Sequence, residues 1–154
     1  MKRIVLFLII SLISFKSISQ ENPELFRTWH LYFVLATDLD TPYEVSEIHP
    51  PIYPFITISE TDNPEIVEII GEGACNTFSG TYSHAYDPSY AEILAIDFSN
   101  TQDDCGVQLH NSFEDSFFGF MGGGWYGIQA DNQGFTLRID NPLMGYALFK
   151  SYPL

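Results

Sequence analysis

Residues 73–82 read Gly73-Ala74-Cys75-Asn76-Thr77-Phe78-Ser79-Gly80-Thr81-Tyr82 and hold the first of only two cysteines in the chain. From Thr77 to Tyr86 small polar side chains alternate with larger ones, so every second residue from Phe78 onward would face the same way. Successive strand side chains point to opposite faces, so this pattern predicts a half-buried strand with an aromatic inner face. Gly80 interrupts the aromatic row, which favours a bend in a strongly curved sheet.

Cys75 and Asn76 stand where a glycine-rich turn enters this strand. One interpretation is a nucleophilic thiol with an amide helper. The other is half of a disulfide beside a turn-forming asparagine. The second cysteine, Cys105, would close a loop of about 30 residues, for which chain entropy gives roughly 3–4 kcal/mol of stabilisation. Because the N-terminus indicates export to an oxidising compartment, we expect Cys75 and Cys105 to be disulfide-bonded.

The first 19 residues have the organisation of a signal peptide. Lys2 and Arg3 precede an apolar run over residues 4–15, and Ser17 and Ser19 place small side chains at the cleavage-site positions. That run is short for a membrane span, and no cysteine lies near the cleavage site, where a lipoprotein would need one. We therefore expect an exported protein, periplasmic or extracellular and not a lipoprotein, with residues 20–154 forming a single domain.

The expected mature chain is strongly acidic. It keeps three cations, Arg27, Arg138 and Lys150, against all 20 acidic residues, which gives a formal net charge of −17. Nucleic acid and anionic membrane surfaces would repel such a protein. The charge is compatible with cationic partners or divalent ions, although a solvated acidic exterior is the simpler explanation.

Short runs of alternating apolar and polar residues, separated by turn-forming residues, predict an all-antiparallel arrangement of strands. Besides 77–86, strands are expected at 27–35, 52–60, 65–70, 92–99, 125–130, 135–139 and 143–150. On the first strand, Trp29, Leu31, Phe33 and Leu35 share the expected inward face, and part of the other face, formed by His30, Tyr32 and Val34, is expected to be covered too. On 92–99 the expected core face consists of Leu94, Ile96 and Phe98.

One segment has helical periodicity and is expected to begin at Ser112 or Asn111 and to end at the glycines 122–124. Its apolar stripe is expected in the core and consists of Phe113, Phe117 and either Phe120 or Met121. The predicted fold class is therefore α+β, mainly β. We expect a strongly curved antiparallel sheet of about eight strands with one short helix packed against it.

Several short patterns occur in the order found in one known family. Trp29-His30-Leu31 lies in the opening strand, and Cys105 precedes a helix that carries Glu114 and Phe117. Later strands contain Tyr126-Gly127-Ile128 and Leu137-Arg138-Ile139. The central signature is the turn and strand at 73–82, with Gly73, Cys75, Asn76, Phe78, Gly80 and Tyr82. In these patterns the chain resembles the META domain (HslJ-like) family of exported bacterial proteins over nearly its whole expected mature length.

The resemblance implies a compact α+β fold and no established catalytic residues. Two features depart from the family pattern: Arg27-Thr28 replaces a glycine often found before the tryptophan, and the stretch 36–51 is long and acidic. A lipocalin-like domain also begins with a Trp-bearing strand. It would, however, place its helix after the eighth strand rather than between the fifth and sixth.

The sequence contains no set of residues with catalytic or metal-binding spacing. No serine lies in a Gly-x-Ser-x-Gly elbow, and Asp38-x-Asp40 lacks the remaining ligands of a calcium loop. No two of the four histidines, His30, His49, His84 and His110, have ligand-like spacing. We expect a buried, hydrogen-bonded role for His84. We further expect no catalytic, metal-binding or cofactor-binding residues, and a protein that is not an enzyme.

Two functions remain open, ahead of an unrecognised enzyme or divalent-ion site. The first is a non-enzymatic domain, related to the envelope or to stress, that binds an unknown protein partner. The alternative is a lipocalin-like binder of a small apolar ligand, for which the expected lining of the inner sheet face is Phe78, Tyr82, Tyr86, Trp125 and Tyr126. The stretch 36–51 is the expected place for variable specificity. The sequence specifies neither the partner nor the oligomeric state.

Overall fold

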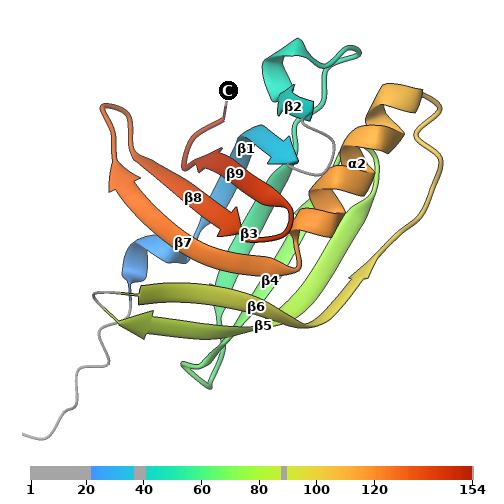
Figure 1. Cartoon of the computed structure of the whole chain (residues 1–154). Helices are drawn as coiled ribbons and strands as arrows, with labels where there is room; N and C mark the ends of the chain where they lie inside the picture. The colour runs from blue at the N-terminus through green and yellow to red at the C-terminus, as the bar shows by residue number, and fades with distance from the viewer. Residues whose placement is uncertain (1–21, 37–40, 88–89, 154) are drawn as a thin grey trace, which may run out of the picture.

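The protein forms one antiparallel sheet that closes on itself. The computed structural model describes residues 22–36, 41–87 and 90–153. The expected signal peptide, Asp38 and Asp40 therefore lie outside the described residues. The strand order is β2-β1-β3-β4-β5-β6-β7-β8-β9, and an additional β1–β9 pairing closes eight of the strands into a barrel (Figure 1). This arrangement confirms the predicted fold class.

The bounds of eight strands lie within a few residues of those predicted, whereas β2 was not predicted. The strands are β1 Thr28–Ala36, β2 Thr41–Glu44, β3 Phe55–Glu60, β4 Ile66–Glu72, β5 Thr77–Asp87, β6 Tyr90–Asn100, β7 Gly123–Ala130, β8 Phe135–Asn141 and β9 Gly145–Lys150. Two short 3-10 helices, η1 Pro23–Leu25 and η2 Val45–Glu47, and one α-helix, α2 Gln108–Phe120, complete the described elements.

A β-bulge changes which residues of β1 face the core. Opposite β9, Leu31 pairs with Phe149 and Phe33 with Leu148, so Tyr32 is an extra residue in β1. Such an extra residue shifts the alternation by one position. Trp29 and Leu31 are buried as predicted, but beyond the bulge Val34 is the buried residue. The prediction that Phe33 and Leu35 point inward is therefore wrong.

A second bulge shifts the alternation of inward and outward residues in β6. Tyr82 pairs with Ala95 and Thr81 with Asp97, which leaves Ile96 without a partner on β5. Ile93 is consequently buried, whereas Leu94 and Ile96 are exposed. The prediction that these two residues face the core is wrong. Phe98, beyond the bulge, packs against the core as expected.

The helix α2 supplies much of the core and lies against the barrel close to β2 (Figure 1). It begins at Gln108, a turn earlier than predicted, and Val107 at its N-cap position makes no side-chain hydrogen bond. Phe113, Phe117 and Phe120 are buried, which confirms the predicted core stripe. The Phe117 ring packs edge-on against Phe78 of β5, with ring centroids 5.8 Å apart.

Part of the acidic stretch 36–51 lies among the described residues and forms regular elements. Its described part contains β2 and η2, and Tyr43, Val45 and Ile48 are buried. The ring of Tyr43 meets Phe113 of α2 at 5.8 Å between centroids. Strand β3 starts only at Phe55, after a proline-rich approach. Within the described residues, no helix has both the length and the apolar character to cross a membrane.

Candidate functional site

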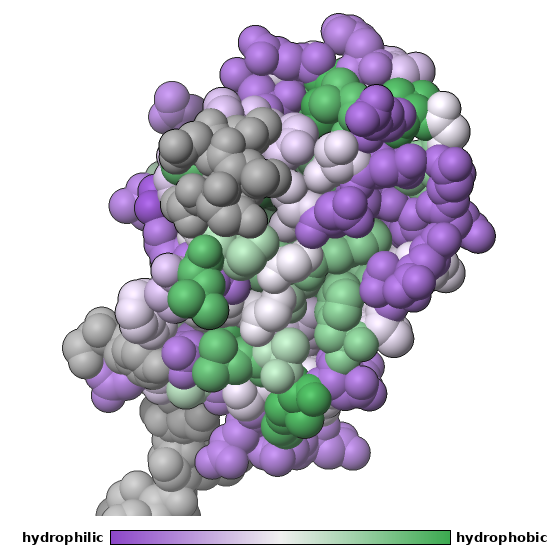
Figure 2. Space-filling view, turned by 45° about the vertical axis from the view of Figure 1, so that its right-hand side comes forward, coloured by the Kyte–Doolittle hydropathy of each residue, from purple (hydrophilic) through white to green (hydrophobic). Residues whose placement is uncertain are grey.

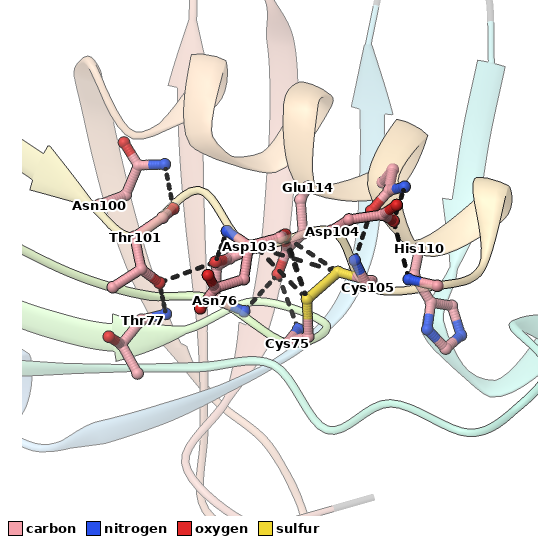
Figure 3. Close-up of a disulfide and its surroundings, with 12 residues drawn as sticks. Cys75, Asn76, Thr77, Asn100, Thr101, Asp103, Asp104, Cys105, His110 and Glu114 are labelled. Atoms are coloured by element: carbon pink, nitrogen blue, oxygen red, sulfur yellow. Dashed lines mark hydrogen bonds between the residues drawn. A yellow bond between two sulfur atoms is a disulfide. The ribbon is translucent and has the colours of Figure 1, made fainter.

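The disulfide joins the β4–β5 turn to the segment that leads into α2 (Figure 3). Cys75 and Cys105 are bonded at an S–S distance of 2.06 Å, with their Cα atoms 5.6 Å apart. This confirms the predicted pairing. Both sulfur atoms lie near the carboxylate of Glu114, and the three groups lie within 4.8 Å of one another. Because the thiolate is the nucleophilic and metal-binding form of cysteine, the disulfide provides neither a nucleophile nor thiolate ligands here.

Asn76 is a structural residue, because its buried side chain has no free hydrogen-bonding position. The amide oxygen accepts from the Asp103 N–H and the Thr101 hydroxyl, both at 2.8 Å. The amide nitrogen donates to the Asp103 carbonyl at 2.8 Å and to Glu114 Oε2 at 2.5 Å. An amide has two acceptor and two donor positions, and all four are used. This arrangement leaves no role for Asn76 as a catalytic helper.

Glu114 is the buried charge around which this junction is organised. Its side chain is 5% exposed, and Oε1 accepts the backbone N–H groups of Cys75 and Asn76, both at 2.8 Å. Hydrogen bonds to an ionised acceptor are stronger than neutral ones. No role of its own was predicted for Glu114 from the sequence. The sequence feature that could have indicated this role is the position of Glu114, directly after Phe113 of the apolar stripe of the helix.

Two glycines of the signature are required by close packing. A Cβ at Gly73 would lie 2.6 Å from Glu114 Oε1, and a Cβ at Gly80 would lie 2.6 Å from the Asp97 carbonyl oxygen. Both distances are shorter than real Cβ contacts. The signature at 73–82 therefore fixes how the turn, the loop before α2 and the helix pack.

The residues predicted to line an inner ligand site differ in burial. Tyr82 is fully buried and donates to the Met121 carbonyl at 2.9 Å. Tyr126 is also buried, with its hydroxyl 2.8 Å from His84 Nε2, which confirms the buried, hydrogen-bonded role of His84. Burial raises the pKa of both tyrosines.

Phe78, also predicted to line the site, is buried in the aromatic core. Trp125, in contrast, is 49% exposed on the outside of β7 and Tyr86 is 39% exposed near the end of β5. The inward orientation expected for Trp125 is wrong. The neighbouring Tyr126 occupies the inner position because of the register of β7 with β8.

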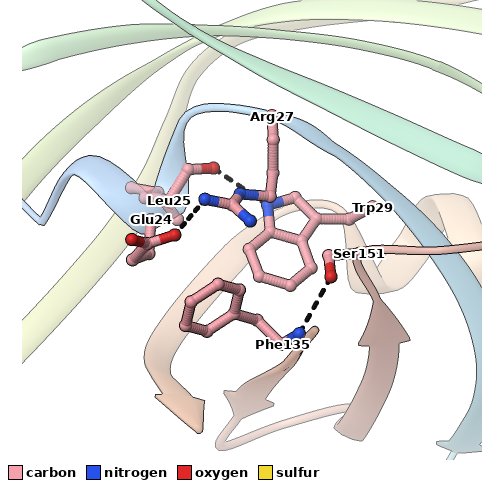
Figure 4. Close-up of polar contacts among 6 residues, drawn as sticks. All are labelled: Glu24, Leu25, Arg27, Trp29, Phe135 and Ser151. Atoms are coloured by element: carbon pink, nitrogen blue, oxygen red, sulfur yellow. Dashed lines mark hydrogen bonds and ion pairs between the residues drawn. The ribbon is translucent and has the colours of Figure 1, made fainter. Parts of the chain in front are cut away.

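The three cations of the described chain lie on or next to strands β1, β8 and β9, and each faces an aromatic ring. Arg27 lies 4.7 Å from the centroid of Phe135, beside Trp29, and forms an ion pair with Glu24 (Figure 4). Arg138 lies 4.0 Å from the ring of Tyr146 and pairs with Asp140. Lys150 lies 4.8 Å from the ring of Tyr32 and 5.3 Å from that of Tyr152.

A groove opens where β1 and β3 separate at one end of the barrel. Its volume is about 670 Å³. The segment 45–55 forms one side, and strand β1, the start of the β4–β5 turn and the chain end at 153 complete it. Its apolar lining residues are Leu31, Val45, Ile48, Pro51, Ile52, Pro54, Phe55, Ala74 and Pro153, and its side chains with polar groups are His30, Ser46, Tyr53 and Glu72.

The groove has a buried apolar floor and a polar, accessible mouth. Leu31, Val45 and Ile52 are buried, whereas Tyr53 is 74% exposed. His30, Phe55 and Glu72 form one row across β1, β3 and β4, because His30 pairs with Phe55 and Phe55 pairs with Glu72. Burial lowers the pKa of His30, which favours the neutral imidazole.

Sequence reasoning located the groove only in part. The stretch 36–51, marked for variable specificity, supplies Val45, Ser46, Ile48 and Pro51. The rest of the groove could have been indicated by the apolar residues that recur through the proline-rich segment 45–55. None of the predicted inner liners Tyr82, Tyr86, Trp125 and Tyr126 lines this groove.

On the face shown in Figure 2, hydrophilic side chains surround smaller groups of hydrophobic ones. A shallow, polar depression of about 460 Å³ lies beside the disulfide junction and is lined by residues that include Asp103, Asp104 and Asp115. Hydrogen bonds from the Asn111 side chain and the Gly106 N–H lower the pKa of Asp104.

Comparison with known proteins gives a likeness of fold only. No protein-family profile matches the chain, and no curated protein matches its sequence. The solved NMR structure of a protein from Burkholderia xenovorans is similar, with a TM-score of 0.58, 16% sequence identity and 80% of each chain covered. At this identity the likeness supports the curved β architecture with its helix and carries no information on function.

Proposed function

We propose that the chain is an exported, non-catalytic binding protein of the META (HslJ-like) kind, and that the groove between β1 and the segment 45–55 is its ligand site. The observation that carries this proposal is the groove itself. Its volume of about 670 Å³ lies in the range typical of small-molecule sites. Such sites combine an apolar lining with a few polar groups, as this groove does with His30, Ser46 and Glu72.

The chemistry of the remaining polar groups supports binding rather than catalysis. The two cysteines are joined, and Asn76 and Glu114 use their hydrogen-bonding positions on each other and on the backbone. His84 lies beside Tyr126, and His110 Nε2 lies 2.9 Å from the Pro50 carbonyl oxygen. A nucleophile, a base and an orienting group would need to lie within hydrogen-bonding reach of one another.

Export and family are supported by separate observations. The N-terminal pattern of Lys2, Arg3 and the apolar run is typical of a signal peptide, and disulfides persist in oxidising compartments. The META signature residues Gly73, Asn76 and Gly80 have the packing roles described above. These roles give a physical reason for the signature and agree with a structural rather than catalytic purpose.

Filling the groove tests the assignment. The probe is N-phenyl-1-naphthylamine, a neutral apolar dye whose fluorescence rises in apolar surroundings. Ser46 is exposed and lines the groove, so Ser46→Trp should place an indole in it without disturbing the core. We expect saturable binding by the wild type and at least a tenfold weaker affinity in Ser46→Trp.

The matched control is Ser59→Trp, because Ser59 is also exposed but lies on β3 away from the groove. This variant should bind the dye like the wild type. Equal affinity in all three proteins would place the dye elsewhere and contradict the assignment. The absence of saturable binding by the wild type would contradict it equally.

A second candidate function is protein binding through the outer face of β6 and β7. Leu94, Ile96 and Trp125 are exposed there on neighbouring strands, and exposed apolar groups of this kind often mark interaction surfaces. Cross-linking of the exported protein in its native compartment would test this. A specific partner should be lost with Ile96→Lys and retained with Gln129→Lys, an exposed β7 control.

A further inference from the structure

Glu72 is the one acidic side chain that lines the groove, and the nearby cation Lys150 is the cross-strand neighbour of His30 on β9. Two further carboxylates, Glu44 and Glu47, lie at η2 next to the lining residues Val45 and Ser46. Among the described residues Glu72 makes no ion pair, because the two ion pairs found there involve Arg27 and Arg138. Lys150, the remaining cation of the described chain, is directed to the rings of Tyr32 and Tyr152.

The groove also places aromatic rings next to this carboxylate. Phe55 is the direct cross-strand neighbour of Glu72, and Tyr53 stands largely exposed two residues earlier. Cations are attracted to the faces of aromatic rings and to carboxylates. On the other side of Phe55 in this row lies His30, whose pKa is lowered by burial, which favours the neutral imidazole, and beyond it lies Lys150 of β9.

We propose that the groove selects small organic cations, namely amines that carry an apolar aliphatic or aromatic body. The ammonium group would lie at the mouth against Glu72 and the rings of Tyr53 and Phe55. The apolar body would cover the floor formed by Leu31, Val45 and Ile52. This inference rests on the proposed function and adds the charge class of the ligand. The volume of about 670 Å³ limits the ligand to the size of a typical small molecule.

Three dansyl probes with the same fluorophore separate charge from apolar contact. Dansylcadaverine is cationic, dansylamide is neutral and dansylglycine is anionic. We expect dansylcadaverine to bind the oxidised protein about fivefold more tightly than dansylamide at low salt, the scale set by one accessible carboxylate. Dansylglycine should bind more weakly than either. The preference for the cation should shrink as salt screens the carboxylate.

Two matched variants test which carboxylate gives the preference for the cationic probe. Glu72→Gln should bring the affinity for dansylcadaverine to that for dansylamide while leaving dansylamide binding unchanged. Glu68→Gln removes the same charge four residues earlier on β4, where Glu68 is exposed and does not line the groove. It should keep the wild-type preference, which controls for the net charge of the whole molecule.

The outcomes distinguish this inference from the proposal on which it rests. If all three probes bind alike, or if Glu68→Gln and Glu72→Gln lose the preference equally, the groove remains a ligand site but cation selection by Glu72 is wrong. If no dansyl probe binds the wild type and the neutral dye also fails, the groove is not a ligand site. Circular dichroism of both variants confirms that they are folded.

Discussion

Replacing Glu114 by glutamine tests how the disulfide junction is held together. The substitution keeps the size of the side chain but exchanges one carboxylate oxygen for an NH₂ group. In the wild type, donors face both oxygens: the N–H groups of Cys75 and Asn76 at Oε1, and the Asn76 amide nitrogen at Oε2. The glutamine side chain in Glu114→Gln has one acceptor oxygen, so it can accept hydrogen bonds at only one of these two positions. At the other position its NH₂ group must face a donor of the protein.

Asn76 cannot relieve this conflict by rotating its amide. Its oxygen already accepts from the Asp103 N–H and the Thr101 hydroxyl. The variant therefore loses one hydrogen bond to a charged acceptor, worth about 1.5–3 kcal/mol, and leaves a buried donor without a partner, which costs about 1–3 kcal/mol. Because the two costs overlap, we expect a loss of about 2–4 kcal/mol in the free energy of unfolding.

Urea unfolding of the oxidised protein, followed by tryptophan fluorescence and circular dichroism, measures this loss. A loss of about 3 kcal/mol corresponds to a fall in Tm of roughly 10 °C for a domain of this size. The control is Asp115→Asn, which makes the same chemical change at the exposed neighbouring position on α2. It should change the free energy of unfolding by less than about 0.5 kcal/mol.

Equal effects of the two substitutions, or a loss of less than about 1 kcal/mol in Glu114→Gln, would refute this role of Glu114. Either result would mean that water or a rearranged Asn76 satisfies the donors. In that case the four hydrogen bonds of the buried Asn76 side chain would not hold the turn at 73–76 rigid.

Three further predictions concern stability. Replacing Cys75 and Cys105 together by serine should lower the free energy of unfolding by roughly 3.6 kcal/mol, the chain-entropy value for a loop of about 30 residues; a loss below about 1 kcal/mol in urea unfolding would contradict this. Phe117→Ala should cost about 3–5 kcal/mol because it leaves a core cavity, whereas Leu109→Ala, at an exposed position of the same helix, should cost less than about 1 kcal/mol. Since burial lowers the pKa of His30 in the folded state, the unfolded chain binds more protons just below about pH 6.5. Stability should therefore fall on acidification through that range and fall less in His30→Gln, and an identical pH dependence of the two proteins in thermal unfolding would contradict the assignment.

Much of the architecture could be predicted because local pattern and global fold agree. Alternation with period two marks strands wherever one face is buried, as on β5 from Phe78 to His84. The stripe formed by Phe113 and Phe117 fixed the core side of the helix. The pairing of Cys75 with Cys105 needed no geometry, because the chain contains only two cysteines.

The errors in the predicted inward faces of β1 and β6 arise from bulges. A bulge adds one residue to one strand only, and the partner strand decides where that happens. Tyr32 and Ile96 have no sequence feature that identifies them as the extra residues. Likewise, Trp125 and Tyr126 are adjacent aromatic residues, so alternation alone cannot tell which of them faces the core.

The sequence by itself determined the strand content, the helix, the disulfide and the acidic charge, because these depend on local periodicity, cysteine number and composition. Only the tertiary structure decided the closure of β1 on β9, the register shifts and the groove. The groove joins His30, the segment 45–55, Glu72 and the chain end at Pro153, which are far apart in the chain. Such a site arises from strand pairing between distant segments, and pairing registers are set by the packed barrel as a whole.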